Sequence, residues 1–240
     1  MTAQLVKLQA APDLVDQVYR ALLDAISDGS LAPGTRITQE DLAERLAVSR
    51  QPVLQALRLL KKDGLVHDAP GRGLLIAPLD AEWIGHVYQV RGALDSLAAR
   101  LAAGRRAQID PQLVEQGRRS ARGKNVKAMI EADIAFHNAL YAASGNPLIG
   151  ASAQLHWVHL RRVMGAVLQS SRQRATIWDE HAAIAAAIGA SDAKLAARLI
   201  EHHGRPAREN LLARLSDVLL NPSLKDKQET DRSPAPAVRS

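Results

Sequence analysis

The chain has 240 residues, of which 47% are hydrophobic but only 3% aromatic, so Ala and Leu must fill its cores and helices are favoured. It contains no Cys, which excludes disulfides and thiolate metal sites, and no apolar run approaches the roughly 20 residues of a membrane span. The net charge of +6 comes from residues 81–240, with 22 Lys/Arg against 15 Asp/Glu, whereas residues 1–80 hold 9 against 10. We therefore expect a cytoplasmic protein with no membrane partner, and composition alone is no argument for nucleic-acid binding.

The first part of the chain is expected to hold one small domain, over residues 12–78. Residues 1–11 lack periodicity and are predicted to form a flexible arm. Apolar residues then recur at helical spacing over residues 13–27, which predicts an amphipathic helix. The Pro33-Gly34 pair predicts a turn after it.

Two short helices are predicted next, one over Gln39 to Leu46 and one from the N-cap Ser49 to a stop at Gly64. Thr38 and Asp41 can form a capping box at the first helix, and Ser49 is a suitable N-cap for the second. Two helices joined by about three residues make a helix-turn-helix, whose second helix fits the DNA major groove. The residues that we expect nearest the base edges are Ser49, Arg50 and Gln51.

A β-hairpin is predicted after this pair of helices, from short apolar runs at residues 65–67 and 74–77. Its tip contains Gly71 and Arg72, and Arg72 could reach a phosphate or the minor groove. Helix, helix and hairpin in this order indicate a winged helix-turn-helix that binds double-stranded DNA.

The rest of the chain, over residues 82–220, is predicted to be an all-α antiparallel bundle, and residues 221–240 a disordered tail. The fold class is therefore mainly α. The predicted helices are Ala81–Ala103, Pro111–Ala121, Val126–Ala143, Pro147–Ser170, Gln173–Ile188 and Asp192–Leu219.

Polar residues interrupt the apolar faces of three of these helices. Asp133 and His137 lie one turn apart on one face, His181 lies on another, and His203 continues the apolar face of the last helix. His202 lies about 100° away from that face. One carboxylate and three imidazoles suit a divalent metal ion (Zn, Ni, Fe or Mn), while the alternative is a buried Asp–His pair with two hydrogen-bonded core histidines.

The segment LAPGTRITQEDLAERLAVSRQPVLQALRLLKKDGLV resembles the DNA-binding domain of GntR-type bacterial transcription regulators. The family usually has Arg and Glu after the PV pair, where this chain has Leu54 and Gln55. The DNA contact that the resemblance assigns to that Arg therefore does not transfer, and Arg50, Gln51 and Arg72 remain to make the contacts.

The segments DIAFHNALYAASGNP and DEHAAIAAAIGASDAKLAARLIEHH resemble the FCD effector domain of the FadR-type branch, and the short six-helix form resembles the VanR-type variant. Many members bind a divalent metal through one Asp and three His. The resemblance thus implies these ligands: Asp133, His137, His181 and His203. It also implies that Arg91, in VYQVRGALDSLAARLAA, faces the cavity and holds an anionic effector. The alternative for Arg91 is a buried salt bridge to Asp95 or another acid.

The sequence hypothesis is a homodimeric bacterial transcription regulator that senses a small organic acid through a metal-containing effector domain. Repression and activation are both compatible with these residues, and repression is the working hypothesis. The alternatives are a regulator whose effector is the metal ion and a metalloenzyme. An enzyme would need a general base, and no Glu lies on the helical faces that carry the predicted ligands.

Overall fold

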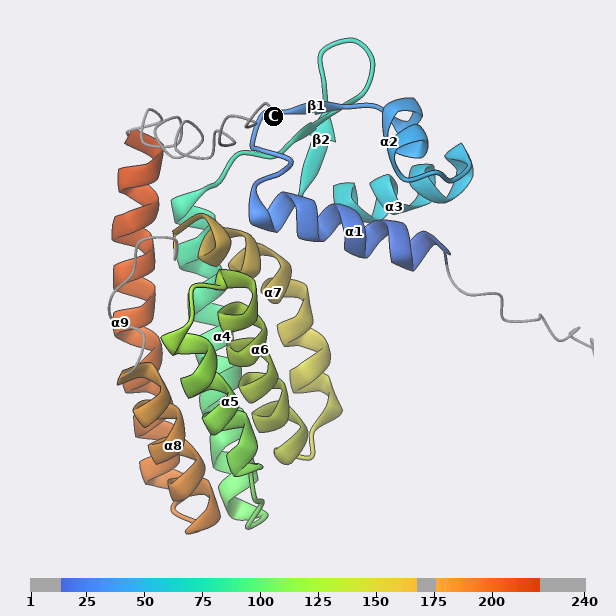
Figure 1. The fold of residues 1–240 in the computed structure, drawn as a ribbon. Coiled ribbons are helices and arrows are strands. Elements are labelled where there is room, and N and C mark those ends of the chain that lie inside the picture. Colours follow the sequence, from blue (N-terminus) through green and yellow to red (C-terminus); the bar gives the residue numbers. More distant parts are fainter. Residues whose placement is uncertain (1–13, 168–175, 221–240) are drawn as a thin grey trace, which may run out of the picture. The chain divides into compact units, whose positions relative to one another are not determined.

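The computed structural model describes residues 14–167 and 176–220, and it divides into two compact units between Pro78 and Leu79. Figure 1 shows the order of the helices and strands along the chain. The predicted arm over residues 1–11 and the predicted tail over residues 221–240 lie outside the described residues.

The first unit is built on three helices, α1 (Leu14–Asp28), α2 (Gln39–Arg45) and α3 (Arg50–Lys62). Helix α1 packs against α3, because each presents an apolar stripe at helical spacing. The buried residues of these stripes are Val18, Leu22, Ile26, Val53, Leu57 and Leu60. This core buries Pro52 and Val53 in the first turn of α3 and leaves Ser49, Arg50 and Gln51 exposed.

The two N-caps of this unit differ. The Thr38 hydroxyl accepts a hydrogen bond from the Asp41 backbone N–H at 3.2 Å, as the capping pattern predicts. Ser49 has the extended backbone of an N-cap, with φ −68° and ψ 162°, but its side chain makes no capping hydrogen bond. Ser49 is thus the N-cap residue, as predicted, but the predicted capping hydrogen bond of its hydroxyl is not formed.

The small sheet has the strand order β1-β3-β2, and both strand pairs are antiparallel. Strands β2 (Val66–Asp68) and β3 (Leu74–Ile76) form the predicted hairpin. Strand β1 (Arg36–Ile37) was not predicted, because two residues carry no readable alternation. Gly73 has φ +92°, and a Cβ there would lie 2.7 Å from the Ile37 carbonyl oxygen, so only glycine fits beside β1.

The second unit is all-helical over the part of it that the structure describes. Its helices are α4 (Ala81–Gly104), α5 (Pro111–Arg122), α6 (Val126–Ala143), α7 (Pro147–Val167), α8 (Thr176–Gly189) and α9 (Ala193–Leu220). These bounds match the predicted ones closely, while the predicted helix ends at residues 168–170 and 173–175 lie outside the described residues. Helix α9 continues through Pro206.

Helix α4 packs against α6, α7, α8 and α9, and Figure 1 shows it running behind α5 and α6. Its packed face is rich in Ala, which lets neighbouring helices approach closely. The most buried members of this face are Ala98, Ala99, Ala102 and Ala103. None of the helices in residues 14–167 and 176–220 is long and apolar enough to cross a bilayer.

Candidate metal centre, ligand cavity and DNA-contacting surface

Four potential metal ligands from three helices meet inside the second unit. Asp133 and His137 come from α6, His181 from α8 and His203 from α9. Each offers one ligand atom, and these atoms all lie within 4.8 Å of one another. The i, i+4 spacing places Asp133 and His137 on one face of α6, and the packing of α8 against α9 brings the two other imidazoles to the same point. His202, the neighbour of His203, is exposed.

His181 is the least satisfied polar group of this cluster. Its side chain is 0% exposed, and neither ring nitrogen has a hydrogen-bond partner. Burial holds the pKa of His181 well below its usual 6.5, and the neighbouring His203 and His137 lower it further. The ring is therefore neutral and has a free lone pair. Because a buried polar group without a partner is costly, a cation bound between these side chains would satisfy His181.

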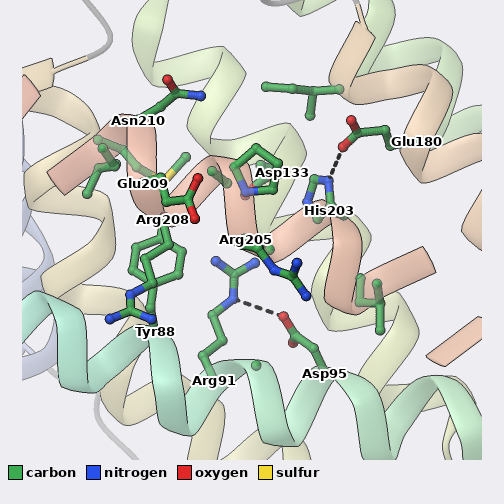
Figure 2. Close-up of a pocket in the computed structure, with 18 of the residues that line it drawn as sticks. Tyr88, Arg91, Asp95, Asp133, Glu180, His203, Arg205, Arg208, Glu209 and Asn210 are labelled. Carbon is green, nitrogen blue, oxygen red and sulfur yellow. Dashed lines mark hydrogen bonds and ion pairs between the residues drawn. The ribbon is translucent and has the colours of Figure 1, made fainter. Parts of the chain in front are cut away.

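His203 is oriented by an acidic neighbour. Its Nδ1 lies 2.7 Å from Oε2 of Glu180, and Figure 2 shows this contact at the edge of the cavity. A carboxylate only accepts, so Nδ1 donates and Nε2 keeps its lone pair, an arrangement that raises the basicity of metal-binding histidines. Only Glu residues on the ligand-bearing helical faces were considered from the sequence, and Glu180 lies off those faces, so its contact with His203 was not predicted. Glu180 lies beside the apolar face of α8, and only the packing of α8 against α9 brings it to His203.

The two ring nitrogens of His137 contact Arg91 and Asp95. Nε2 of His137 lies 2.6 Å from a terminal nitrogen of Arg91, and Nδ1 lies 3.5 Å from Oδ1 of Asp95. Burial lowers the pKa of His137, and the Arg91 charge lowers it further. The neutral Nε2 has one lone pair, so metal coordination at this nitrogen and the Arg91 hydrogen bond exclude each other.

Arg91 is buried, where it forms a salt bridge with Asp95 and lines a cavity. Its Nε lies 3.3 Å from Oδ2 of Asp95, and its guanidinium carbon lies 4.1 Å from the centre of the Trp157 ring. Tyr141 donates a hydrogen bond of 2.5 Å to Asp95. Burial alone would raise the pKa of Asp95, but Arg91 and then His137 outweigh it and lower the pKa to about 2. The salt-bridge alternative is thus confirmed, and Arg91 also lines a cavity.

This cavity has a volume of about 560 Å³ and lies within the second unit (Figure 2). Arg91 from α4, Asp133 from α6 and His203 from α9 are among the residues that line it. Its walls include apolar side chains, among them Met129, Met164, Trp178 and Leu211. A cleft of this size with a few convergent polar groups is typical of a small-molecule site.

The residues expected to contact DNA lie on the surface of the first unit. Ser49, Arg50 and Gln51 are exposed at the start of α3, and Gly71 and Arg72 are exposed at the tip of the hairpin. No direct contact between these two groups is found in the described residues. Arg50 forms an exposed ion pair with Glu40 at 3.4 Å.

The sequence did not predict the role of Arg36, which contacts the tip of the β2–β3 hairpin. Arg36, in β1, donates hydrogen bonds to the carbonyl oxygens of Arg72 and Pro70, at 2.5 and 3.0 Å. It therefore fixes the shape of the hairpin tip. Because a single Arg next to a turn gives no periodic signal, only the pairing of β1 with β3 shows this role.

Two protein families match this chain in consecutive segments. Residues 14–76 match the bacterial regulatory proteins of the gntR family, and residues 86–205 match the FCD domain. The chain belongs to the gntR family of bacterial regulators and carries an FCD domain. It is thus a DNA-binding transcription regulator and not an enzyme, and the metalloenzyme alternative is wrong.

Relatives of this GntR-family protein carry names of the same kind. An uncharacterized HTH-type transcriptional regulator of Bacillus subtilis, YdhC, is 32% identical over 54% of this chain, and the match spans 60% of that protein. Another, from an unstable DNA locus of Streptomyces ambofaciens, is 27% identical over 81% of this chain and 83% of its own.

The fold of this GntR-family chain also matches a solved structure. Escherichia coli McbR/YncC superposes with a TM-score of 0.72 over 85% of this chain and 98% of its own, at 21% identity. That likeness shows the shared fold.

Proposed function

We propose that this GntR-family regulator is a cytoplasmic homodimer that binds operator DNA and responds to a small organic acid bound beside a divalent metal ion in its FCD domain. The observation that carries the proposal is the cluster of Asp133, His137, His181 and His203, with ligand atoms within 4.8 Å of one another. This cluster adjoins the cavity that contains Arg91.

The donor set supports a divalent transition metal. One carboxylate and three neutral imidazoles suit Zn²⁺, Ni²⁺, Fe²⁺ or Mn²⁺. Neither ring nitrogen of His181 has a hydrogen bond, although Nε2 lies 3.5 Å from Oδ1 of Asp133, and Glu180 directs the lone pair of His203 away from itself. A bound ion would supply positive charge to an anion in the cavity.

Arg91 is suited to recognise the acid. Its planar guanidinium can hold a carboxylate through two hydrogen bonds, and Asp95 and Trp157 keep it in place. A hydroxy- or dicarboxylic acid would thus meet a guanidinium and a metal ion in the same cavity.

On the DNA side, Ser49, Arg50 and Gln51 at the start of α3 would lie nearest the base edges. Gly71 and Arg72 at the hairpin tip would contact the backbone or the minor groove. The acid alters operator affinity only if it binds the DNA-competent and DNA-incompetent dimers unequally. Release of repression is the expected readout.

An exposed apolar surface in the FCD domain supports the homodimer. Trp83, Val90 and Leu97 lie seven residues apart on α4 and are 51%, 48% and 42% exposed. Leu148 and Leu155 lie seven residues apart on α7 and are 71% and 67% exposed. The Trp83 ring meets His159 of α7 edge-on at 6.0 Å, which joins the two helices. A second copy is the fitting partner, since two-fold regulators read two operator half-sites.

The dimer surface can be tested by charge insertion. Leu97→Glu should give a monomer in sedimentation with weakened operator binding, whereas Leu14→Glu, at a residue 41% exposed on α1, should leave the dimer intact. A dimeric Leu97→Glu variant would exclude this surface.

The sensing proposal can be tested with malate and its neutral diamide. Malate should raise the melting temperature of zinc-loaded protein and change its operator affinity, and the diamide should do neither. The malate effect should shrink in Arg91→Ala and vanish when the metal is stripped. If the metal alone changes operator affinity and malate adds nothing, the ion itself is the effector. Equal stabilisation of apo and loaded protein by the diamide would refute the proposal.

A further inference from the structure

The ligand cavity has a second group of cations on α9, apart from the metal cluster. Arg205 and Arg208 both line the cavity, and Figure 2 shows Arg205 extending toward the Arg91–Asp95 pair and Arg208 lying beside Tyr88. A terminal nitrogen of Arg208 comes within 4.0 Å of where a Cβ on Gly85 would lie, so this side chain spans from α9 to α4. Both arginines therefore face the same space as Arg91.

These two arginines have no ion-pair partner within residues 14–167 and 176–220. The acids that line the cavity are mostly engaged elsewhere. Asp95 pairs with Arg91, Glu180 accepts from His203, and Glu201 accepts from Ser96 and lies 3.7 Å from Arg100.

Among the described cavity-lining acids outside the metal cluster, Glu209 alone has no partner. Its single charge cannot neutralise Arg205 and Arg208 together. Because Arg208 is half-buried, its charge is partly removed from water, and an anion from solution would stabilise it.

The size of the cavity also indicates a ligand larger than a four-carbon acid. The volume of about 560 Å³ lies within the range of about 300–1,000 Å³ that pockets for drug-sized ligands have, whereas a four-carbon diacid has only about eight non-hydrogen atoms. The walls include Met129, Met164 and Trp178, which suit an apolar chain or ring. A four-carbon acid at Arg91 would thus leave much of the cavity and its apolar wall unfilled.

We infer that the effector carries two anionic groups joined by an apolar segment, one group at Arg91 and the metal cluster and the other at Arg205 and Arg208. This inference rests on the proposed sensing function and narrows its ligand class. The second anionic group is a carboxylate or a phosphate-type group, because a guanidinium holds either through paired hydrogen bonds.

The experiment compares acids that differ only at the far end. Calorimetric titration of zinc-loaded full-length protein would use hexanoate against adipate and octanoate against suberate, with 6-phosphonohexanoate as the phosphate-type probe. At the best chain length, the doubly charged acid should bind at least tenfold more tightly than its monoacid. The preferred far group distinguishes carboxylate from phosphate.

The variants and their matched control all replace arginines of α9. Arg205→Gln with Arg208→Gln should reduce the preference to less than threefold and leave monoacid affinity unchanged. Arg198→Gln, an exposed position on the same helix outside the cavity, should retain the full preference. Should the double variant fold poorly, the exposed Arg205→Gln alone should lose part of the preference.

The outcomes separate this inference from the function on which it rests. Equal binding of monoacids and diacids by the wild type, with binding lost in Arg91→Ala, leaves acid sensing intact and refutes the second subsite. A preference that survives in the double variant also refutes the assignment to these arginines. No binding of any acid refutes both.

Discussion

The two units of this regulator place their charged side chains in opposite environments. In the DNA-binding unit, the side chains of the Arg50–Glu40 pair are 66% and 54% exposed, whereas those of the Arg91–Asp95 pair in the FCD domain are 8% and 9% exposed. The histidines beside that buried pair, His137 and His181, are fully buried. Exposed charges can exchange their partners for DNA phosphates at little cost, while buried charges need partners within the protein.

Because of this contrast, the side chains of the FCD domain indicate a binding site more strongly than the exposed side chains of the DNA-binding unit do. An exposed Arg is satisfied by water, so its presence alone says little about what it binds. A buried imidazole with two unpartnered nitrogens and a buried arginine beside a cavity both need an explanation. Four predictions would sharpen or break the comparison.

The largest effect is expected from Asp95→Ala. Removing this carboxylate leaves the buried Arg91 charge without its partner, so the free energy of unfolding should fall by about 3–5 kcal/mol. Glu40→Ala, in the exposed pair, should cost about 1 kcal/mol or less. Urea denaturation monitored for each unit would measure both. Equal costs would mean that burial does not distinguish the two pairs.

Metal removal should have the next largest effect. An ion present at a hundred times its dissociation constant stabilises the fold by about 2.7 kcal/mol, which chelation would remove. His137→Ala, His181→Ala and His203→Ala should each lower the bound metal measured by elemental analysis, and His202→Ala, at an exposed position, should not. Unchanged metal content in all four variants would leave hydrogen-bonded core histidines as the explanation.

A smaller effect is expected on DNA. Arg50→Ala should weaken operator binding by about 1–3 kcal/mol if Arg50 reads a base edge, and Arg72→Ala should cost less discrimination. Arg20→Ala, in an exposed pair on α1, is the control. Titration of operator and random duplexes would measure the difference. Equal losses on both duplexes would identify Arg50 as a phosphate contact.

The smallest effect concerns the two N-caps. Thr38→Ala should lower the unfolding free energy by about 1 kcal/mol, because its hydroxyl accepts from the Asp41 N–H. Ser49→Ala should change stability by less than about 0.5 kcal/mol, because its side chain caps nothing, but should weaken operator binding if it contacts DNA. A large stability loss in Ser49→Ala would show that its hydroxyl caps α3 in solution.

The sequence determined the elements that depend on local pattern. Apolar spacing and capping residues located the helices of both units, and the hairpin followed from two short apolar runs around a Gly-rich tip. Phase along single helices also distinguished the buried His203 from the exposed His202. These predictions succeeded because each depends on residues within two or three turns of one another.

The tertiary structure alone decided which distant side chains meet. Glu180 reaches His203, Arg91 reaches His137, and Arg36 reaches the hairpin tip, and none of these pairings has a local signal. The rotation of each helix about its axis and the register between helices fix such contacts. Both depend on how whole faces pack together, which no short stretch of sequence encodes.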